Sequence, residues 1–327
     1  MLALRGGRVL TADGWSCDDL LIDGGTVVAP GRGEADHVLD VTGAVVAPGM
    51  VDLHVHAAGG HSAQGPRSDL DGMARCLAAA GTTSFLATAS AAPLEELRDL
   101  LGGGRPSAGA RCVGVHLEGP WLSPDAAGAQ PPGALRSPSV DEALSLLSAG
   151  DDLRCVTLAP ELPGALDVVS ALVARGVRVS LGHSTTSYED AVAALAAGAR
   201  GVTHCFNAMS QLSGRDPGLV GAALSWPDLV VEVIADGVHV HPAAVLALHA
   251  ARGPEGVALV SDCVDGCAPA DALVRDGDVL RLPDGRLAGS ALALVDAVRN
   301  VVSWGVPLAD ALAMSSTTPA AALGLDV

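Results

Sequence analysis

Short apolar segments that each run into a metal-competent side chain are the most constraining feature of this chain. Each of the five segments is rich in Val and Leu and is followed by Gly, Asn, Ser or Pro, a pattern typical of buried strands. The six side chains at their ends are His54, His56, Glu118, His183, His204 and Asp262. Because the carboxyl ends of the strands of a closed (β/α)8 barrel converge on one face, we expect all six to meet there.

From Val45 onward, strand patterns alternate with helical ones. The eight expected strands cover 45–56, 82–89, 111–118, 153–159, 177–183, 201–206, 229–235 and 256–262. Helical patterns cover 69–80, 93–102, 140–149, 164–174, 187–197 and 242–251, whereas 208–228 is less regular. This order favours a TIM-like barrel over an open doubly wound sheet, which would not bring five strand ends to one point.

The two ends of the chain do not follow this alternation of strands and helices. Residues 1–46 alternate apolar positions with Gly and Asp-Gly turns, which predicts a small β-sandwich-type accessory domain before a barrel over 47–327. After the eighth strand we expect a hairpin at 278–289 and helices at 290–303 and 307–315.

Composition excludes several classes of protein. The net charge of −18 argues against nucleic acid as a partner, and no apolar run of about 18 residues suits a membrane span. The first residues lack the pattern of a signal peptide, and the seven scattered cysteines favour reduced thiols in a cytoplasm. With aromatics at only 2% of residues, the core must be aliphatic.

The chain contains no lysine, which excludes catalytic mechanisms and binding sites that depend on a lysine amine. All 19 basic residues are arginines, which excludes a lysine Schiff base, a P-loop lysine and a carbamylated lysine bridge between two metal ions. A bridge would therefore have to be a carboxylate, and Glu118 is the obvious candidate.

The spacing of His54 and His56 indicates metal binding, because side chains two residues apart share one face of a strand. Histidine and carboxylate donors suit one or two divalent ions per subunit, with Zn²⁺ favoured and Fe²⁺, Mn²⁺ or Co²⁺ as alternatives. Asp262 suits an acid/base that takes a proton from water and returns it to a leaving amine. His116, two residues before Glu118, is either a partner of a ligand or a packed core residue.

Several segments resemble the amidohydrolase superfamily and, within it, the N-acetylglucosamine-6-phosphate deacetylases. They occur in the family's order across residues 47–325, and include APGMVDLHVHAAGG, VHLEGPWLSP, LGHSTTSYEDA, GVTHCFNAMS, SGRDPGLVGAAL, VIADGVHVHP and DGRLAGS. The combination of HLEGPW, THCFNAM and ADGVHV is quite specific, whereas the HxH pair alone would indicate only the superfamily.

The resemblance implies a role for each matching residue. Glu118, His183 and His204 would bind one metal ion and His54 and His56 a second, with Asp262 as the acid/base. The resemblance also implies nine residues that would contact the substrate: Ala129, Gln130, Asn207, Ala208, Arg215, His239, Leu287, Ala288 and Gly289. Among them, Arg215 would bind phosphate from the neighbouring subunit of a homodimer, and 287–289 would close over the N-acetyl group.

Two departures from the family pattern stand out. Gln130 occupies a position where relatives often carry His, so phosphate affinity is expected to differ. The chain stops soon after its TPA motif at 318–320, where relatives add strands to the accessory domain, so we expect a reduced β layer or a dimer contact there.

The sequence therefore predicts a metal-dependent deacetylase of N-acetyl-D-glucosamine 6-phosphate, active in amino-sugar breakdown. One alternative is an amidohydrolase for an unphosphorylated amino sugar, an N-acyl amino acid or a dipeptide. Another is a non-catalytic barrel that binds a sugar phosphate, although an acid/base at Asp262 would have no purpose there.

Overall fold

The computed structural model describes the chain except for residues 30–32, 66–67, 268–272, 278 and 326–327. It forms two compact units, Met1–Gly49 and Met50–Val327. None of the helices in the described ranges has the length and apolar character needed to cross a membrane. All seven cysteines are free thiols.

The first unit is built from short strands in two sheets. The strands are β1 (Leu2–Arg5), β2 (Arg8–Thr11), β3 (Gly14–Ser16), β4 (Leu20–Asp23), β5 (Thr26–Val28), β6 (His37–Asp40) and β7 (Val45–Val46). One sheet has the order β5-β4-β1-β6 and the other β3-β2-β7. Only Ala3 and Val9 are buried apolar side chains among the described residues of this unit, so its core is small.

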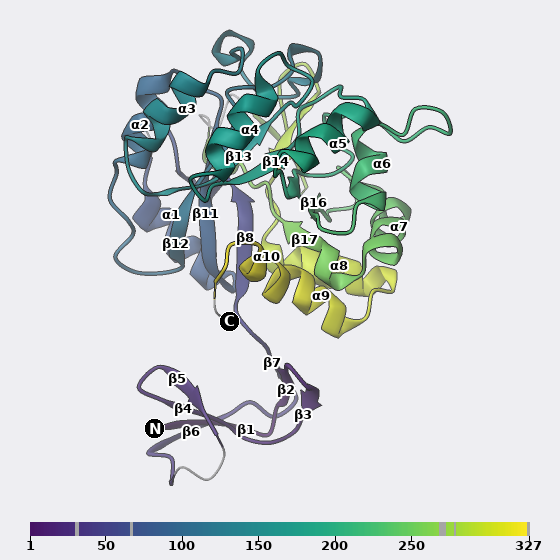
Figure 1. The fold of residues 1–327 in the computed structure, drawn as a ribbon. Coiled ribbons are helices and arrows are strands. Elements are labelled where there is room, and N and C mark those ends of the chain that lie inside the picture. The colour runs from purple at the N-terminus through teal and green to yellow at the C-terminus, as the bar shows by residue number, and fades with distance from the viewer. Residues whose placement is uncertain (30–32, 66–67, 268–272, 278, 326–327) are drawn as a thin grey trace. The chain divides into compact units, whose positions relative to one another are not determined.

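Eight parallel strands form the wall of a barrel in the second unit (Figure 1). They are β8 (Met50–Val55), β11 (Thr82–Ser90), β12 (Arg111–Glu118), β13 (Leu153–Leu158), β14 (Arg178–Leu181), β15 (Gly201–Val202), β16 (Val230–Ile234) and β17 (Val257–Val260). Neighbours along the chain are neighbours in the barrel, and the expected (β/α)8 class is confirmed.

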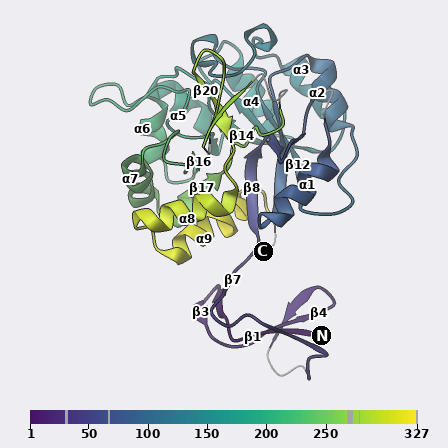
Figure 2. The ribbon, with the colours of Figure 1, turned by 180° about the vertical axis from the view of Figure 1, so that it is seen from behind.

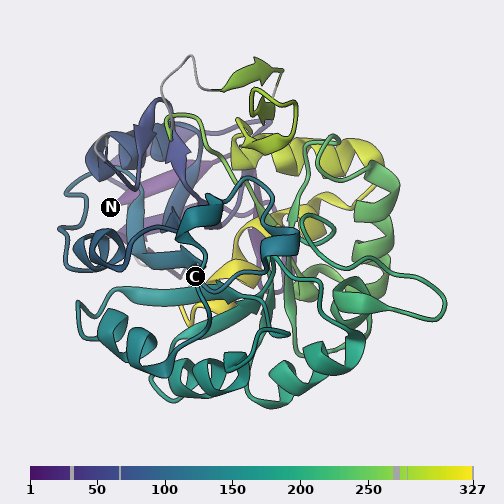
Figure 3. The ribbon, with the colours of Figure 1, turned by 90° about the horizontal axis from the view of Figure 1, so that it is seen from above.

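Helices surround the barrel, as the view from above shows (Figure 3). They are α1 (Leu70–Ala79), α2 (Leu94–Leu101), α3 (Val140–Leu147), α4 (Ala165–Val173), α5 (Tyr188–Ala196), α6 (Gly218–Ser225), α7 (Pro242–Arg252), α8 (Leu294–Trp304), α9 (Leu308–Ser315) and α10 (Thr317–Ala322). Short 3-10 turns occur at Pro124–Ala126, Pro132–Ala134 and Pro254–Gly256. Serine side chains cap the first turns of two helices: Ser139 and Ser187 accept hydrogen bonds from backbone N–H groups of α3 and α5.

Additional strands lie at the carboxyl ends of the barrel strands. They are β9 (Ala57–Ala58), β10 (His61–Ser62), β18 (Val274–Asp276), β19 (Val279–Arg281) and β20 (Leu287–Ser290), of which β19 and β20 form the expected hairpin. The backbone of Ser290 bonds to Asp262 and Val264, so β20 is attached to the segment that follows β17 (Figure 2). The hairpin is thereby held beside the barrel mouth.

Several expected element boundaries were wrong. The strand expected over 45–56 is interrupted at Pro48 and Gly49, and only β8 belongs to the barrel. Strands β14, β15 and β17 each end two residues before His183, His204 and Asp262, because those three residues adopt positive φ angles that end a strand.

Two helices were not expected from the sequence. Helix α6 has six of its eight residues buried, so the apolar stripe that reveals a surface helix is missing. Helix α10 contains Pro319, which the ring geometry allows within the first turn of a helix. Its Ala320 packs with Val51, Leu53 and Val260 in an apolar cluster formed by the barrel strands.

A buried carboxylate joins the first and last strands of the barrel, which stand at the two ends of the hydrogen-bonded strand order. Asp52 is fully buried, and its Oδ1 accepts hydrogen bonds from the backbone N–H groups of His54 (3.2 Å) and Ser261 (3.3 Å). The backbone N–H of Asp262 donates to the carbonyl of His54 at 2.9 Å. These bonds align β8 with β17 and so set where His54 and Asp262 lie relative to each other.

Replacing Asp52 tests this closure. Asp52→Ala leaves two buried N–H groups without their acceptor and should lower the unfolding free energy by about 2–4 kcal/mol. Asp52→Asn retains the acceptor oxygen and should cost no more than about 1 kcal/mol. Urea unfolding of both variants checks the difference, and equal losses would contradict a role for the acceptor.

Candidate metal centre

The carboxylate of Glu118 is the point on which four imidazole rings converge. Its Oε1 lies 2.9 Å from the Nε2 atoms of both His183 and His204 and 3.5 Å from that of His54. Its Oε2 lies 3.3 Å from Nε2 of His56. Glu118 ends β12, so its side chain reaches the barrel axis at the height where the other strands end.

These residues form two groups of donors that share Glu118. One comprises His54, His56 and Glu118, and the other Glu118, His183 and His204, with the donor atoms of each group within 4.8 Å of one another. The Nε2 atoms are 3.1 Å apart in the first histidine pair and 3.2 Å apart in the second. Neutral imidazoles that turn lone pairs toward each other repel, whereas a cation between them is bound, so this donor set fits a divalent metal ion.

Asp262 faces the same centre from the end of the eighth strand. Its Oδ1 lies 3.4 Å from the Nε2 atoms of both His54 and His56. Burial raises the pKa of this carboxyl, but the neighbouring His54 and His56 outweigh burial and lower the pKa below its ordinary value. The ionised form, which is the form that accepts a proton, is therefore favoured.

The backbone is strained at several residues whose side chains lie at or near the candidate metal centre. The non-glycine residues with positive φ in the described ranges are His183, His204, Phe206, Ala208 and Asp262. Such conformations cost about 1–3 kcal/mol each and persist only when the surrounding structure imposes them. Their concentration at one face of the barrel marks it as the functional face.

The pKa values of the donors reflect their mutual charges. Burial raises the pKa of Glu118, but His54 and His183 outweigh it and hold that pKa well below its ordinary value. Burial lowers the pKa of His54, but Glu118 and Asp262 outweigh it and raise that pKa well above its ordinary value. Protons and a metal ion therefore compete for the same nitrogens, and metal binding releases protons.

A cavity of about 370 Å³ opens beside these donors. The residues expected to contact substrate that line it are Ala129, Gln130, Asn207, Ala208, His239, Leu287, Ala288 and Gly289. Gly289 is required by packing, since a Cβ there would come within 2.7 Å of the Val264 side chain. No arginine lines the cavity among the residues that the structure describes, and Arg215 lies outside it on an exposed loop.

Gln130 contacts Glu118, a candidate metal ligand. Its Oε1 accepts a hydrogen bond from the backbone N–H of Ala91 at 2.8 Å, so its amide nitrogen must face the other way. That nitrogen donates to Glu118 Oε2 at 2.5 Å. The amide is thus held with its N–H groups toward the cavity.

Sequence interpretation missed two carboxylates next to expected site residues. Asp236 accepts hydrogen bonds from the ring Nδ1 of His239 (2.6 Å) and from its backbone N–H (2.8 Å), which fixes the orientation of the ring. Glu232 lies 3.3 Å from Nδ1 of His54. The signal for Glu232 was present, since it is the single charged residue within the apolar strand VVEVI. His116 proves to be a packed partner, its ring in a T-shaped contact with the ring of His54.

A closed parallel barrel with these donors at the carboxyl ends of its strands has the architecture of metal-assisted hydrolases. The sequence profile of the amidohydrolase family matches residues 45–327. The chain therefore belongs to the amidohydrolase family. The family relationship agrees with the donor set described above.

The chain is similar to particular members of that family. It is 40% identical to the N-acetylglucosamine-6-phosphate deacetylase of Vibrio furnissii over 84% of this chain and 73% of that protein. It is 37% identical to the N-acetylgalactosamine-6-phosphate deacetylase of Escherichia coli O157:H7, over 99% of this chain and 90% of that protein. A solved structure of the Mycobacterium smegmatis N-acetyl-D-glucosamine-6-phosphate deacetylase, a mutant in complex with N-acetyl-D-glucosamine 6-phosphate, superimposes with a TM-score of 0.87 at 32% identity, covering 99% of this chain and 90% of that one.

The shared position of Glu118 leads to a prediction about metal content. Glu118→Gln should strip divalent ions from both donor groups, because each loses its only charged donor. His56→Ala should reduce the metal content of one group and leave the Glu118–His183–His204 group loaded. Elemental analysis after dialysis against chelator measures both, and wild-type metal content in Glu118→Gln would contradict a shared carboxylate.

Proposed function

We propose that the protein hydrolyses the acetamide of N-acetyl-D-glucosamine 6-phosphate to D-glucosamine 6-phosphate and acetate. The observation that carries this proposal is the convergence of Asp262 and two donor groups on a cavity of about 370 Å³. The names of the relatives supply the substrate class.

Asp262 and His239 have separate roles in the proposed reaction. A divalent ion bound at the centre supplies Lewis acidity, which activates water and polarises a carbonyl group. Asp262 accepts a proton as the water oxygen bonds to the acetyl carbon, and returns it to the amine as the C–N bond breaks. His239, whose Nδ1–H is held by Asp236, would stabilise the charge that develops on the carbonyl oxygen by donating from Nε2, which requires a proton on that nitrogen as well.

We propose one or two divalent ions per subunit, with Zn²⁺ as the native metal and Fe²⁺, Mn²⁺ or Co²⁺ as alternatives. Imidazole and carboxylate donors suit all four. The free cysteines support a location in the cytoplasm, where thiols remain reduced.

A homodimer would complete the substrate site. A phosphate needs a focused positive charge on a protein of net charge −18, yet the described lining residues of the cavity include no arginine. Arg215 lies in the segment between β15 and α6, which projects from the barrel (Figures 1 and 3). We propose that this loop delivers Arg215 to the phosphate in the neighbouring subunit.

A second candidate substrate is N-acetyl-D-galactosamine 6-phosphate. The relative from Escherichia coli O157:H7 carries that name and aligns with nearly the whole chain. The two sugars differ only in the configuration at C4, so the same centre serves either. An unphosphorylated amino sugar, an N-acyl amino acid or a dipeptide would need other contacts in place of the phosphate subsite.

An acetate-release assay on the metal-loaded protein tests the function. The panel contains both N-acetylhexosamine 6-phosphates, both free sugars, an N-acetyl amino acid and a dipeptide. Acetate release with a clear preference for one phosphorylated sugar is expected. Binding of the sugar phosphate without turnover would instead support a non-catalytic barrel.

Asp262→Asn separates proton transfer from metal binding. The amide retains size but cannot accept the proton, so turnover should fall by roughly 10² or more while metal content persists. Equal loss of metal and turnover would make Asp262 chiefly a ligand, and near-normal turnover would remove it from the mechanism.

Arg215→Ala tests the phosphate contact. A charge-assisted contact is worth about 1.5–3 kcal/mol, so KM should rise about ten- to a hundredfold for the phosphorylated sugar and much less for the free one. Mixing this variant with Asp262→Asn should restore one good site in each heterodimer. Absence of rescue in verified heterodimers would place the action of Arg215 within its own subunit or exclude it.

A further inference from the structure

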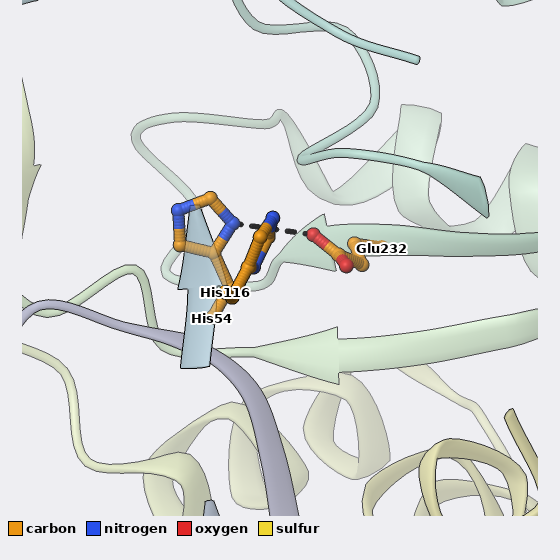
Figure 4. Close-up of side chains that lie close together, drawn as sticks. All are labelled: His54, His116 and Glu232. Carbon is orange, nitrogen blue, oxygen red and sulfur yellow. Dashed lines mark hydrogen bonds and ion pairs between the residues drawn. The ribbon is translucent and has the colours of Figure 1, made fainter. Parts of the chain in front are cut away.

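Behind the metal donors lies a second layer of polar side chains inside the barrel. Its members are fully or almost fully buried: His116, Thr157, Ser180, Thr203 and Glu232. The hydroxyls of Thr157, Thr203 and Ser180 are linked at 2.7 Å each. Figure 4 shows His116 and Glu232 close to His54.

Glu232 is directed at His54 and not at His116. Both ring nitrogens of His116 are already engaged: Nδ1–H donates to the carbonyl of Leu53 at 3.0 Å, and Nε2 accepts from the hydroxyl of Thr157 at 2.7 Å. His116 is therefore not available as a ligand. The Oε2 atom of Glu232 instead lies 3.3 Å from Nδ1 of His54 (Figure 4). The other ring nitrogen of His54, Nε2, is the one that faces Glu118.

This contact determines which nitrogen of His54 carries the proton. A carboxylate accepts a hydrogen bond, so Nδ1 must be protonated and the lone pair must be on Nε2, which faces Glu118 and Asp262. The outer nitrogens of two other donors have neutral partners: His56 has the hydroxyl of Ser90 at 3.4 Å, and His183 has the carbonyl of Ala126 at 2.9 Å. Of these three histidines, only His54 has a charged partner at its outer ring nitrogen, and that partner is Glu232.

The negative charge of Glu232 also adds to the total charge of the side chains around the two donor groups. Together with Glu118 and Asp262 it places three carboxylates within or beside the two donor groups. One divalent ion would leave a net negative charge buried among these groups, which is unfavourable in a barrel interior. With a second divalent ion the excess is one positive charge, and without Glu232 it would be two, so this carboxylate lowers the electrostatic cost of filling the second group.

We propose that Glu232 is a positioning residue that makes the His54–His56 donor group a filled metal site, by fixing the tautomer of His54 and supplying negative charge behind it. The inference rests on the metal centre of the proposed function and is independent of the substrate. A carboxylate behind a ligating histidine typically strengthens metal binding 10- to 100-fold.

Metal titration of the stripped protein tests this proposal, with Zn²⁺ measured by chelator competition and Co²⁺ by its absorption spectrum. The wild-type protein should take up two equivalents. Glu232→Gln should bind the first equivalent unchanged and the second about 10- to 100-fold more weakly. Glu232→Leu, which also loses the hydrogen bond, should weaken the second equivalent further.

Thr157→Val is the matched control, since it removes a polar group from the same buried layer without touching His54 or Glu232. Both equivalents should bind to it within about twofold of wild type, and thermal melting verifies that each variant is folded. Unchanged binding of the second equivalent by Glu232→Gln, or equal weakening of both equivalents, would overturn the proposal. Wild-type uptake of one equivalent together with acetate release would also overturn it while leaving the proposed function intact.

Discussion

The shared carboxylate of Glu118 is the constraint on which the functional face of this protein depends. Four imidazoles from three different strand ends contact it, and a divalent ion held by this carboxylate and the ring nitrogens would bind them together. The barrel supplies the geometry, because each strand end projects toward the same axis. The strain at His183, His204 and Asp262 is tolerated because packing around the barrel mouth leaves these residues no alternative.

Support for this centre comes from outside the donor set. Asp52 aligns the first strand with the last, Gln130 donates to Glu118, Asp236 orients His239, and Glu232 lies behind His54. Each acts through hydrogen bonds that restrict a ring, a carboxylate or, for Asp52, the backbone of two strands to one arrangement, and such restriction is what a metal-dependent hydrolase needs before substrate arrives. The net charge of −18 and the absence of lysine mean that a phosphate subsite, as proposed above, would have to draw its positive charge from arginine.

Much of the architecture was predictable from local pattern. The strands over 82–89, 111–118 and 153–159 agree with β11, β12 and β13 to within a residue, because buried parallel strands are continuous apolar runs. Helix α6 was missed because it is apolar on all sides, and the ends of β14, β15 and β17 were overestimated because positive φ has no clear sequence signature outside glycine.

The sequence by itself determined the candidate donors: which side chains lie at or just beyond the ends of the strands, that His54 and His56 are two residues apart, and that any bridge would have to be a carboxylate. These follow from residue type and from the two-residue period of a strand. Only the tertiary structure decided what stands behind the donors. The sequence marks Gln130 and Glu232 as unusual at their positions but does not name their hydrogen-bond partners, nor those of Asp52 and Asp236. Barrel closure sets these partners, because it brings β8 beside β17 and directs Glu232 of β16 at His54.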